Sequence, residues 1–211
     1  MKVYKSKQEL IQDQISKEHV VLDVGFWGQA IGIDNPEWVH NILKSQAKEV
    51  FGVDLFFNGS QLENIENYKK QSAENFDFEQ KFDVIFAGDL IEHLSNLGQF
   101  LDSCRRNLKK DGKLILTTPN AFNLFNIIEK LIKKEPEVNR DHTIYFNFSV
   151  LKKLLEKNGW MVVEEMYLDD VWSKYKQSLK RKFLYGIYKF MRLFTSKFIE
   201  NIVVVVKLKH N

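Results

Sequence analysis

The chain has 211 residues, 44% of them hydrophobic, and a formal net charge of +3 at pH 7. This size suits a single domain that buries its core without disulfides or a structural metal, and so small a charge does not by itself indicate a nucleic-acid partner. No apolar run approaches the roughly 20 residues of a membrane span, the first residues lack the apolar core of a signal peptide, and the lone Cys104 cannot form an internal disulfide, so we expect a cytoplasmic protein.

Short apolar runs alternate with amphipathic segments along the whole chain. Ser6 and Glu9 form a capping box that predicts a first helix, and Asn35-Pro36 predicts the start of a second one. Further helical patterns cover residues 90–94, 97–108 and 150–157. The predicted strands are 20–24, 50–53, a weak one within 68–72, 82–87, 114–118, 160–163 and 202–206. Strands that alternate with helices predict a three-layer α/β sandwich with a mostly parallel sheet.

Glycines and a carboxylate follow the first two of these strands. In an open parallel sheet, ligands bind beyond the carboxyl ends of the strands. Gly25 and Gly28 permit a close approach of the backbone to a ligand, and Asp54 can accept hydrogen bonds from the two hydroxyls of a ribose. Gly25 and Asp54 are farther apart than the roughly 20 residues of a nicotinamide-dinucleotide fingerprint, and its third glycine is missing, which disfavours a dehydrogenase.

Four segments together resemble the ordered motifs of class I S-adenosylmethionine-dependent methyltransferases, namely residues 21–25, 53–54, 82–94 and 108–120. The resemblance is strongest to the branch that includes ubiquinone-pathway O-methyltransferases and bacterial enzymes encoded with polysaccharide genes. It implies a Rossmann-like sandwich with a seven-stranded sheet. The last strand, 202–206, would run antiparallel between strands 114–118 and 160–163.

The resemblance also implies S-adenosylmethionine as cofactor and S-adenosylhomocysteine as product. Asp23 and Gly25 would lie beside the methionine part of the cofactor, Asp54 would hold its ribose, and Asp89 would line the pocket. The implied cofactor-binding residues are Asp23, Gly25, Phe26, Gly28, Asp54, Ser72, Ala73 and Asp89. Two departures stand out: Trp27 and Gln29 replace the usual second and third glycines, and Ser72 replaces an adenine-binding acid. A catalytically degenerate binding or scaffold protein is therefore the alternative.

Two histidines are the candidate catalytic groups. A hydroxyl acceptor benefits from losing its proton as it attacks, and His93, one turn after strand 82–87, is placed to take that proton or to orient the acceptor. By the resemblance, His142 reaches over the same pocket from beyond strand 114–118. Packing of His93 and solvation of His142 are the alternative interpretations. Our main prediction contains no metal, although Asp89, Glu92, His93 and His142 resemble the magnesium or manganese sites of ubiquinone-pathway and small-RNA O-methyltransferases, so a divalent metal stays open.

A basic segment precedes the last strand. Residues 171–199 contain eight Lys or Arg and no Asp or Glu, and apolar residues recur there every three or four positions. This pattern predicts a basic amphipathic helical insertion within the single domain. Such a helix can cover the acceptor site as a lid, which we favour, or its stretch 172–198 can make a peripheral contact with the inner face of the membrane.

The predicted activity is methyl transfer to a hydroxyl of a sugar, a glycan intermediate or another small molecule. Methylation of nucleic acid would need a wider basic surface than one helical segment. Neither the identity of the acceptor nor the oligomeric state follows from the sequence, because acceptor pockets are built by variable loops and helices.

Overall fold

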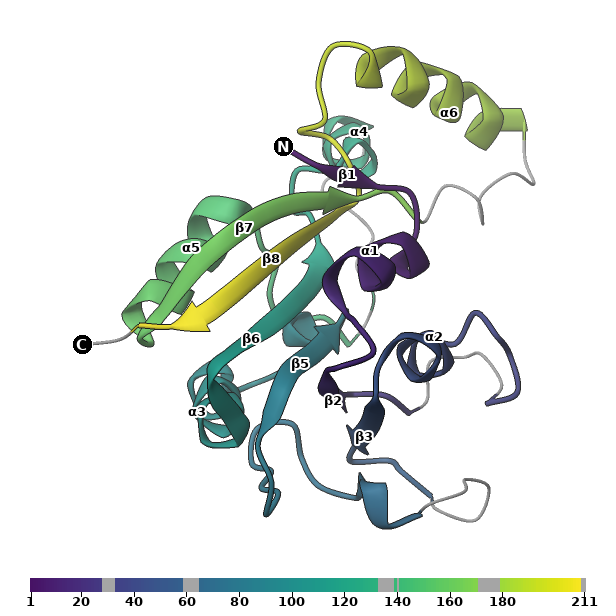
Figure 1. The fold of residues 1–211 in the computed structure, drawn as a ribbon. Coiled ribbons are helices and arrows are strands. Elements are labelled where there is room, and N and C mark those ends of the chain that lie inside the picture. The colour runs from purple at the N-terminus through teal and green to yellow at the C-terminus, as the bar shows by residue number, and fades with distance from the viewer. Residues whose placement is uncertain (28–32, 59–64, 133–138, 140, 171–178, 210–211) are drawn as a thin grey trace.

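The computed structural model describes residues 1–211 apart from 28–32, 59–64, 133–138, 140, 171–178 and 210–211. Within the described residues the chain forms one eight-stranded sheet in the order β1-β7-β8-β6-β5-β2-β3-β4 (Figure 1). The strands are β1 (Val3–Tyr4), β2 (Val20–Val24), β3 (Glu49–Val53), β4 (Tyr68–Lys69), β5 (Phe82–Gly88), β6 (Leu108–Pro119), β7 (Trp160–Leu168) and β8 (Asn201–Leu208). Neighbouring strands are parallel except that β8 runs antiparallel to both β6 and β7.

Helices cover both faces of the sheet. On one face, α1 (Lys7–Gln14) and α2 (Val39–Gln46) bury Leu10, Ile11 and Leu43 against alternate residues of the strands. On the other face, α3 (Leu97–Asn107), α4 (Leu124–Ile132) and α5 (Phe148–Lys157) contribute to a second buried cluster. The last helix, α6 (Leu179–Arg192), stands beside α4 at one end of the sheet (Figure 1).

The predicted three-layer α/β class and the antiparallel last strand are confirmed, but the sheet has one strand more than the seven expected. The additional strand is β1, two residues that pair in parallel with β7 through Val3 and Tyr4. A second difference concerns α2, which begins at Val39. The Asn35 side chain accepts a hydrogen bond from the Glu37 N–H at 2.8 Å and forms a turn before the helix.

The strand directions bring the predicted site residues to one edge of the sheet. Because β2, β3, β5 and β6 are parallel, Gly25, Asp54, Asp89 and Pro119 all follow or end their strands at this edge. Since β8 runs the opposite way, it starts there, and Glu200 precedes it. The carboxyl edge therefore collects groups from both halves of the chain.

Candidate functional site

A cavity of about 370 Å³ opens at this edge of the sheet. Ten of its eleven described lining residues have polar side chains, which offer carboxyl, imidazole, amide and phenol groups. The lining residues are Asp89, Glu92, His93, Pro119, Asn123, Asn126, Asn139, His142, Tyr145, Glu200 and Asn201. The cavity thus contains both predicted catalytic histidines together with Asp89, and it can offer hydrogen bonds in many directions.

His93 and His142 are neighbours although 48 residues separate them in the chain. Their ring centroids lie 4.6 Å apart with the ring planes at 84°. The loop bearing His142 is tied to the short 3-10 helix Ile91–His93, because the Thr143 N–H donates to the Glu92 carbonyl at 2.8 Å and the Thr143 hydroxyl contacts the Leu94 carbonyl at 3.1 Å. His93 Nδ1 lies 3.2 Å from the Asp141 carbonyl oxygen, and its donation there would leave Nε2 as an acceptor.

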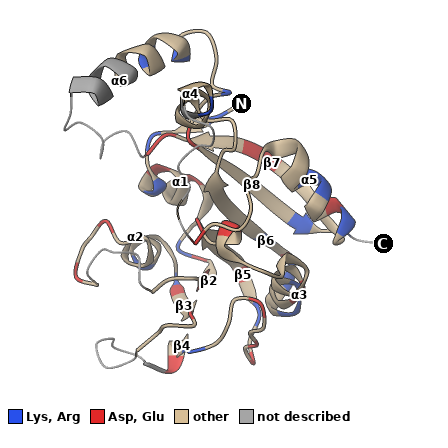
Figure 2. Cartoon of the chain, turned by 180° about the vertical axis from the view of Figure 1, so that it is seen from behind, with Lys and Arg blue, Asp and Glu red and all other residues tan. Residues whose placement is uncertain are grey.

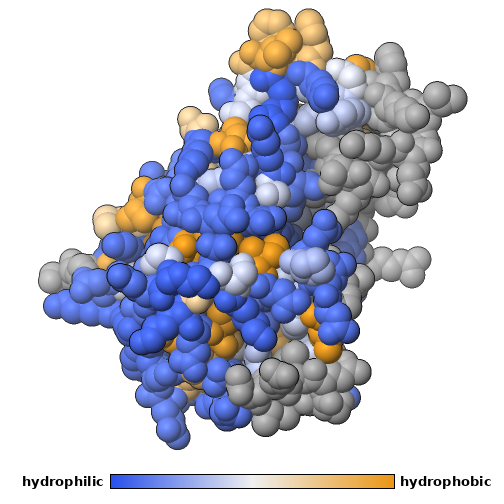
Figure 3. Space-filling view, turned by 45° about the vertical axis from the view of Figure 1, so that its right-hand side comes forward, coloured by the Kyte–Doolittle hydropathy of each residue, from blue (hydrophilic) through white to orange (hydrophobic). Residues whose placement is uncertain are grey.

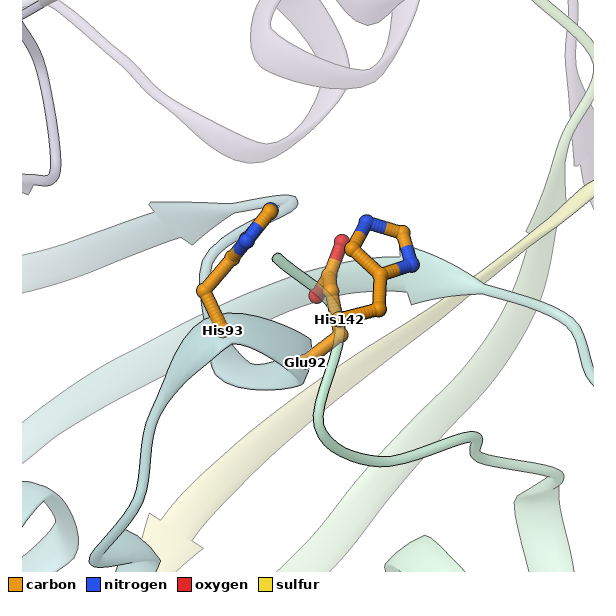
Figure 4. Close-up of side chains that lie close together, drawn as sticks. All are labelled: Glu92, His93 and His142. Atoms are coloured by element: carbon orange, nitrogen blue, oxygen red, sulfur yellow. The ribbon is translucent and has the colours of Figure 1, made fainter. Parts of the chain in front are cut away.

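Glu92 joins these histidines from below, as Figure 4 shows. Its side chain is 1% exposed, and one carboxyl oxygen accepts from the Thr118 hydroxyl at 2.9 Å, while Oε1 is buried with no hydrogen-bond partner in the described structure. Burial, with the nearby Asp89 carboxylate, raises the pKa of Glu92 to about 7. Burial and the neighbouring His93 lower the pKa of His142. Ligand atoms of Glu92, His93 and His142 all lie within 4.8 Å of one another.

Asp89 is held in an uncommon backbone conformation at the end of β5. Its φ of 50° places a non-glycine residue in the left-handed region, which is typical of functional turns. The Thr117 hydroxyl donates to Asp89 Oδ1 at 2.9 Å, and the Lys7 ammonium donates to Oδ2 at 2.6 Å. Burial lowers the pKa of Lys7, but the carboxylates of Asp89 and Asp170 outweigh it and leave that pKa raised. Asp89 is therefore fixed in place by groups from β6 and α1.

Glu200, like Glu92, has a carboxyl group with one buried oxygen that makes no hydrogen bond among the described residues. In Glu200 this atom is Oε2. Burial, with the Asp170 and Asp169 carboxylates, raises its pKa from 4.5 to about 8. The folded protein therefore prefers the protonated acid, and this contribution to stability, present below about pH 4.5, is lost as the pH rises to about 8.

We expect Glu200→Gln to stabilise the protein at pH 9 by about 1–3 kcal/mol relative to wild type, because the amide avoids an unpaired buried charge. At pH 5 the two proteins should differ little, since both side chains are then neutral. Urea unfolding at the two pH values measures this, with Glu156→Gln on the exposed side of α5 as control. Equal pH dependence of all three proteins would contradict the assignment.

Gly25 and Asp54 form the other part of the edge. Gly25 has φ +78°, a conformation that L side chains rarely adopt, and its N–H donates to the Val53 carbonyl at 2.9 Å. Asp54 is 8% exposed, and its two oxygens accept from the Trp27 N–H at 3.0 Å and the Phe56 N–H at 2.8 Å. Burial raises the pKa of Asp54 despite these two bonds. A carboxylate has further lone pairs, so Asp54 can still accept from two hydroxyls.

An aromatic cluster, defined here as Phe26, Trp38, Phe57 and Tyr68, holds the turn between Gly25 and Asp54. The Phe26 side chain is fully buried in it, so this predicted cofactor residue can reach a ligand only through its backbone. Gly52 makes room for the cluster: a Cβ there would lie 2.7 Å from the Phe26 ring. The turn that lacks the usual glycines therefore packs against an aromatic cluster.

The remaining predicted cofactor residues are placed less directly. Gly28 lies outside the described residues. Ser72 and Ala73 follow β4 in partly buried positions, where the Ser72 hydroxyl accepts from the Glu74 N–H at 3.2 Å. Asp23 is 1% exposed and lies under the turn, facing His40. The structure thus brings Asp23, Gly25 and Asp54 together at one part of the edge and Asp89, His93 and His142 at another.

Sequence reasoning missed several residues of this edge. Lys7, His40, Tyr68, Glu200 and Asn201 belong to no motif, and each is distant in the chain from the groups that it contacts or joins. The one available signal was position. Glu200 and Asn201 stand where the antiparallel last strand begins, which is the same edge at which the parallel strands end.

Comparisons with known proteins show the family of the chain. The family described as "Methyltransferase domain" matches residues 17–165. A ubiquinone biosynthesis O-methyltransferase of Nitrobacter winogradskyi is 35% identical over 104 residues, 47% of this chain and 40% of that protein. One of Aliivibrio fischeri is 25% identical over 156 residues, 66% of this chain and 62% of that protein. The chain therefore spans about half the length of such curated relatives.

Solved structures share the fold over nearly the whole chain. A protein of Listeria monocytogenes described as a putative S-adenosylmethionine-dependent methyltransferase gives a TM-score of 0.59 at 12% identity, covering 97% of both chains. The 1,6-didemethyltoxoflavin-N1-methyltransferase of Burkholderia thailandensis, solved with its acceptor and S-adenosylhomocysteine, gives 0.59 at 14% identity, covering 97% of this chain and 77% of that one. At these identities the likeness concerns the fold.

Proposed function

Because the chain belongs to the methyltransferase domain family, we propose that it transfers the methyl group of S-adenosylmethionine to a hydroxyl of a small polar acceptor, such as a sugar or a glycan intermediate. The observation that carries this proposal is the arrangement of two adjoining sites along one sheet edge. Gly25 and Asp54 form one, and the cavity with His93 and His142 forms the other. We also propose that 1–211 is a single methyltransferase domain, with 171–199 as an insertion before β8.

The residues at the first site suit the nucleoside of the cofactor. Asp54 is a carboxylate whose pKa is raised by burial, and a ribose supplies two hydroxyl donors that it can accept from. Gly25 lets the backbone approach closely, and Asp23 would fix the turn beneath the methionine end. Phe26, Gly28, Ser72 and Ala73 complete the proposed cofactor site, and Asp89 would separate it from the acceptor.

Residues of the cavity would handle the acceptor. When bound, S-adenosylmethionine supplies an activated methyl group, so the chain mainly has to orient the acceptor and exclude water. The His142 imidazole has a lowered pKa and is therefore neutral at physiological pH, as a proton acceptor must be. His93 packs edge to face against it and would orient the same hydroxyl. In this proposal His142 takes the proton and His93 positions the acceptor.

The lining of the cavity favours a polyhydroxylated acceptor over an apolar one. Amide and carboxyl groups dominate it, Pro119 is its one aliphatic lining residue among those described, and Tyr145 contributes an aromatic ring. Such groups pair well with sugar hydroxyls, whereas an isoprenoid quinone would leave them without partners. An acceptor from ubiquinone biosynthesis, the pathway in the names of the curated relatives, is therefore not our first choice for this chain.

Two measurements test the proposal. Calorimetry with S-adenosylhomocysteine should give one site per chain, and tritium from labelled S-adenosylmethionine should pass to a neutral glycan fraction. Binding without transfer to any acceptor fraction would favour a scaffold that kept the fold but lost turnover. Absence of binding by folded protein would refute the proposal.

A divalent metal at Glu92, His93 and His142 is the alternative at the same residues. Two imidazoles and a carboxylate fit such an ion, and the unpartnered Glu92 Oε1 favours it. Our main proposal is metal-free, so we expect transfer to stay within about 2-fold after treatment with EDTA. A loss of about 10-fold or more that Mn²⁺ restores would favour the metal instead.

The sequence favours a lid for the basic segment, but the exposed apolar side chains of its described part lead us to propose that 172–198 also makes a peripheral membrane contact. Among the described helices, none combines the length and the hydrophobicity needed to cross a bilayer. The charged residues on the described part of α6 are Lys and Arg (Figure 2), and exposed apolar side chains gather at the top of the molecule (Figure 3). Phe190, Leu193 and Phe194 are 64%, 78% and 76% exposed. Apolar side chains beside basic ones suit an anionic membrane surface.

We expect sedimentation with vesicles that contain phosphatidylglycerol, and much weaker sedimentation with neutral phosphatidylcholine vesicles. Phe190→Ser with Phe194→Ser should weaken the binding by about 100-fold or more, since each buried side chain contributes ~1.5–3 kcal/mol and every ~1.4 kcal/mol is tenfold. Met161→Ser, an exposed position on β7, is the control. If neither kind of vesicle carries the protein down, the proposed membrane contact is wrong.

A further inference from the structure

A fully buried chain of hydrogen bonds runs beneath the turn at Gly25. His40 Nδ1 lies 3.0 Å from Asp23 Oδ2, and His40 Nε2 lies 3.1 Å from the Tyr68 hydroxyl. His40 is 0% exposed, Asp23 1% and Tyr68 8%. The three residues come from α2, β2 and β4, so one imidazole connects a helix, a central strand and the edge strand of the sheet.

The direction of these hydrogen bonds follows from the groups themselves. A carboxylate accepts hydrogen bonds and donates none, so His40 Nδ1 carries the proton that Asp23 accepts. In the neutral imidazole Nε2 is then an acceptor, and the Tyr68 hydroxyl donates to it. Each group in the chain has its partner, which fixes the Asp23 carboxylate in one orientation under Gly25.

The same residues are packed against the turn itself. The Phe26 ring packs against both His40, at 4.9 Å between centroids, and Tyr68, at 5.2 Å. Gly25, on one side of Phe26, is bonded to the Val53 carbonyl, and Trp27, on the other, donates its N–H to Asp54. The turn is therefore held from below by side chains, at a place where Trp27 and Gln29 stand instead of glycines.

We propose that His40 is a positioning residue for the cofactor. By orienting Asp23 and anchoring Tyr68, it presets the Gly25–Trp27 turn in the shape that the cofactor needs, so that binding does not have to order the loop. The inference rests on the proposed function, because it assumes that this turn contacts S-adenosylmethionine.

Two substitutions test the two nitrogens of the imidazole one at a time. In His40→Asn the amide stands near the position of Nδ1 and can still donate to Asp23. In His40→Gln it stands near the position of Nε2 and can meet only Tyr68. Calorimetry with S-adenosylhomocysteine should give a Kd within about 3-fold of wild type for His40→Asn and raised about 10-fold or more for His40→Gln. Tyr68→Phe should fall between them.

Thermal unfolding of each variant and the imidazole ¹⁵N spectrum of the wild type complete the test. Binding should shift the His40 resonances, whereas a purely structural histidine would lower the melting temperature of all variants and leave the Kd of the folded protein unchanged. Equal Kd values for folded His40→Asn and His40→Gln would overturn the inference alone. Failure of the folded wild type to bind S-adenosylhomocysteine would overturn it together with the proposed function.

Discussion

Replacement of Asp54 by alanine is expected to raise the Kd for S-adenosylhomocysteine about 100-fold or more. The proposed ribose hydroxyls donate to a carboxylate, and each charge-assisted bond of this kind contributes ~1.5–3 kcal/mol. Burial strengthens the effect because the site offers little competing water: Asp54 is 8% exposed. Calorimetry on folded protein measures the change.

Asp54 accepts hydrogen bonds from two backbone N–H groups. A matched control must therefore also remove a carboxylate that accepts from a backbone N–H. Asp83 provides it at the opposite edge of the sheet, where its carboxylate accepts from the Val20 N–H at 2.9 Å and pairs with Lys109. Asp83→Ala should lower stability and leave the Kd within about 3-fold of wild type. An Asp54→Ala protein that binds like Asp83→Ala would contradict the ribose assignment.

Loss of the His142 imidazole is expected to slow methyl transfer about 100-fold or more, because general-base catalysis contributes 10²–10⁴-fold at most sites. The change should leave the affinity for S-adenosylhomocysteine nearly unaltered, since His142 lines the acceptor cavity. Initial rates with the acceptor fraction that the wild type methylates measure this. His93→Ala should cost less, because His93 only positions the hydroxyl in this scheme.

His19→Ala is the matched control for both histidines. His19 is partly exposed before β2, where its ring accepts from the Ser16 N–H at 3.1 Å, far from the cavity edge. We expect wild-type rates from it. Wild-type rates from His142→Ala as well would refute a catalytic role for that residue.

Much of the fold could be predicted because most strands coincide with short apolar runs in the sequence. The runs 20–24, 82–87 and 202–206 are apolar apart from Asp23 and Asp83, as is typical of strands covered on both faces, and they lie within β2, β5 and β8. By contrast, β1 has only two residues, and its pairing with β7 depends on contacts across the whole chain. The sequence analysis did not predict the helix α4, although its apolar residues recur at helical spacing and the Asn123 side chain before it accepts from the Asn126 N–H at 2.9 Å.

The candidate site was predictable where position along a strand decides it. Asp54 and Asp89 could be placed at the carboxyl edge because each follows a clear strand. The meeting of His142 with His93 came only from the family resemblance, since it depends on bonds such as that from Thr143 to the Glu92 carbonyl. His40 carries no local signal at all: it is one polar residue on the buried face of α2, paired through space.

The central claim is that the edge formed by Gly25 and Asp54 holds the nucleoside of the cofactor and presents its sulfur to the cavity of His93 and His142. A crystal structure of the protein soaked with S-adenosylhomocysteine tests it most directly. We predict both ribose hydroxyls within ~3 Å of the Asp54 carboxylate, and the sulfur beside Asp89 at the mouth of the cavity. A nucleoside bound elsewhere, with Asp54 still bonded only to Trp27 and Phe56, would contradict the claim.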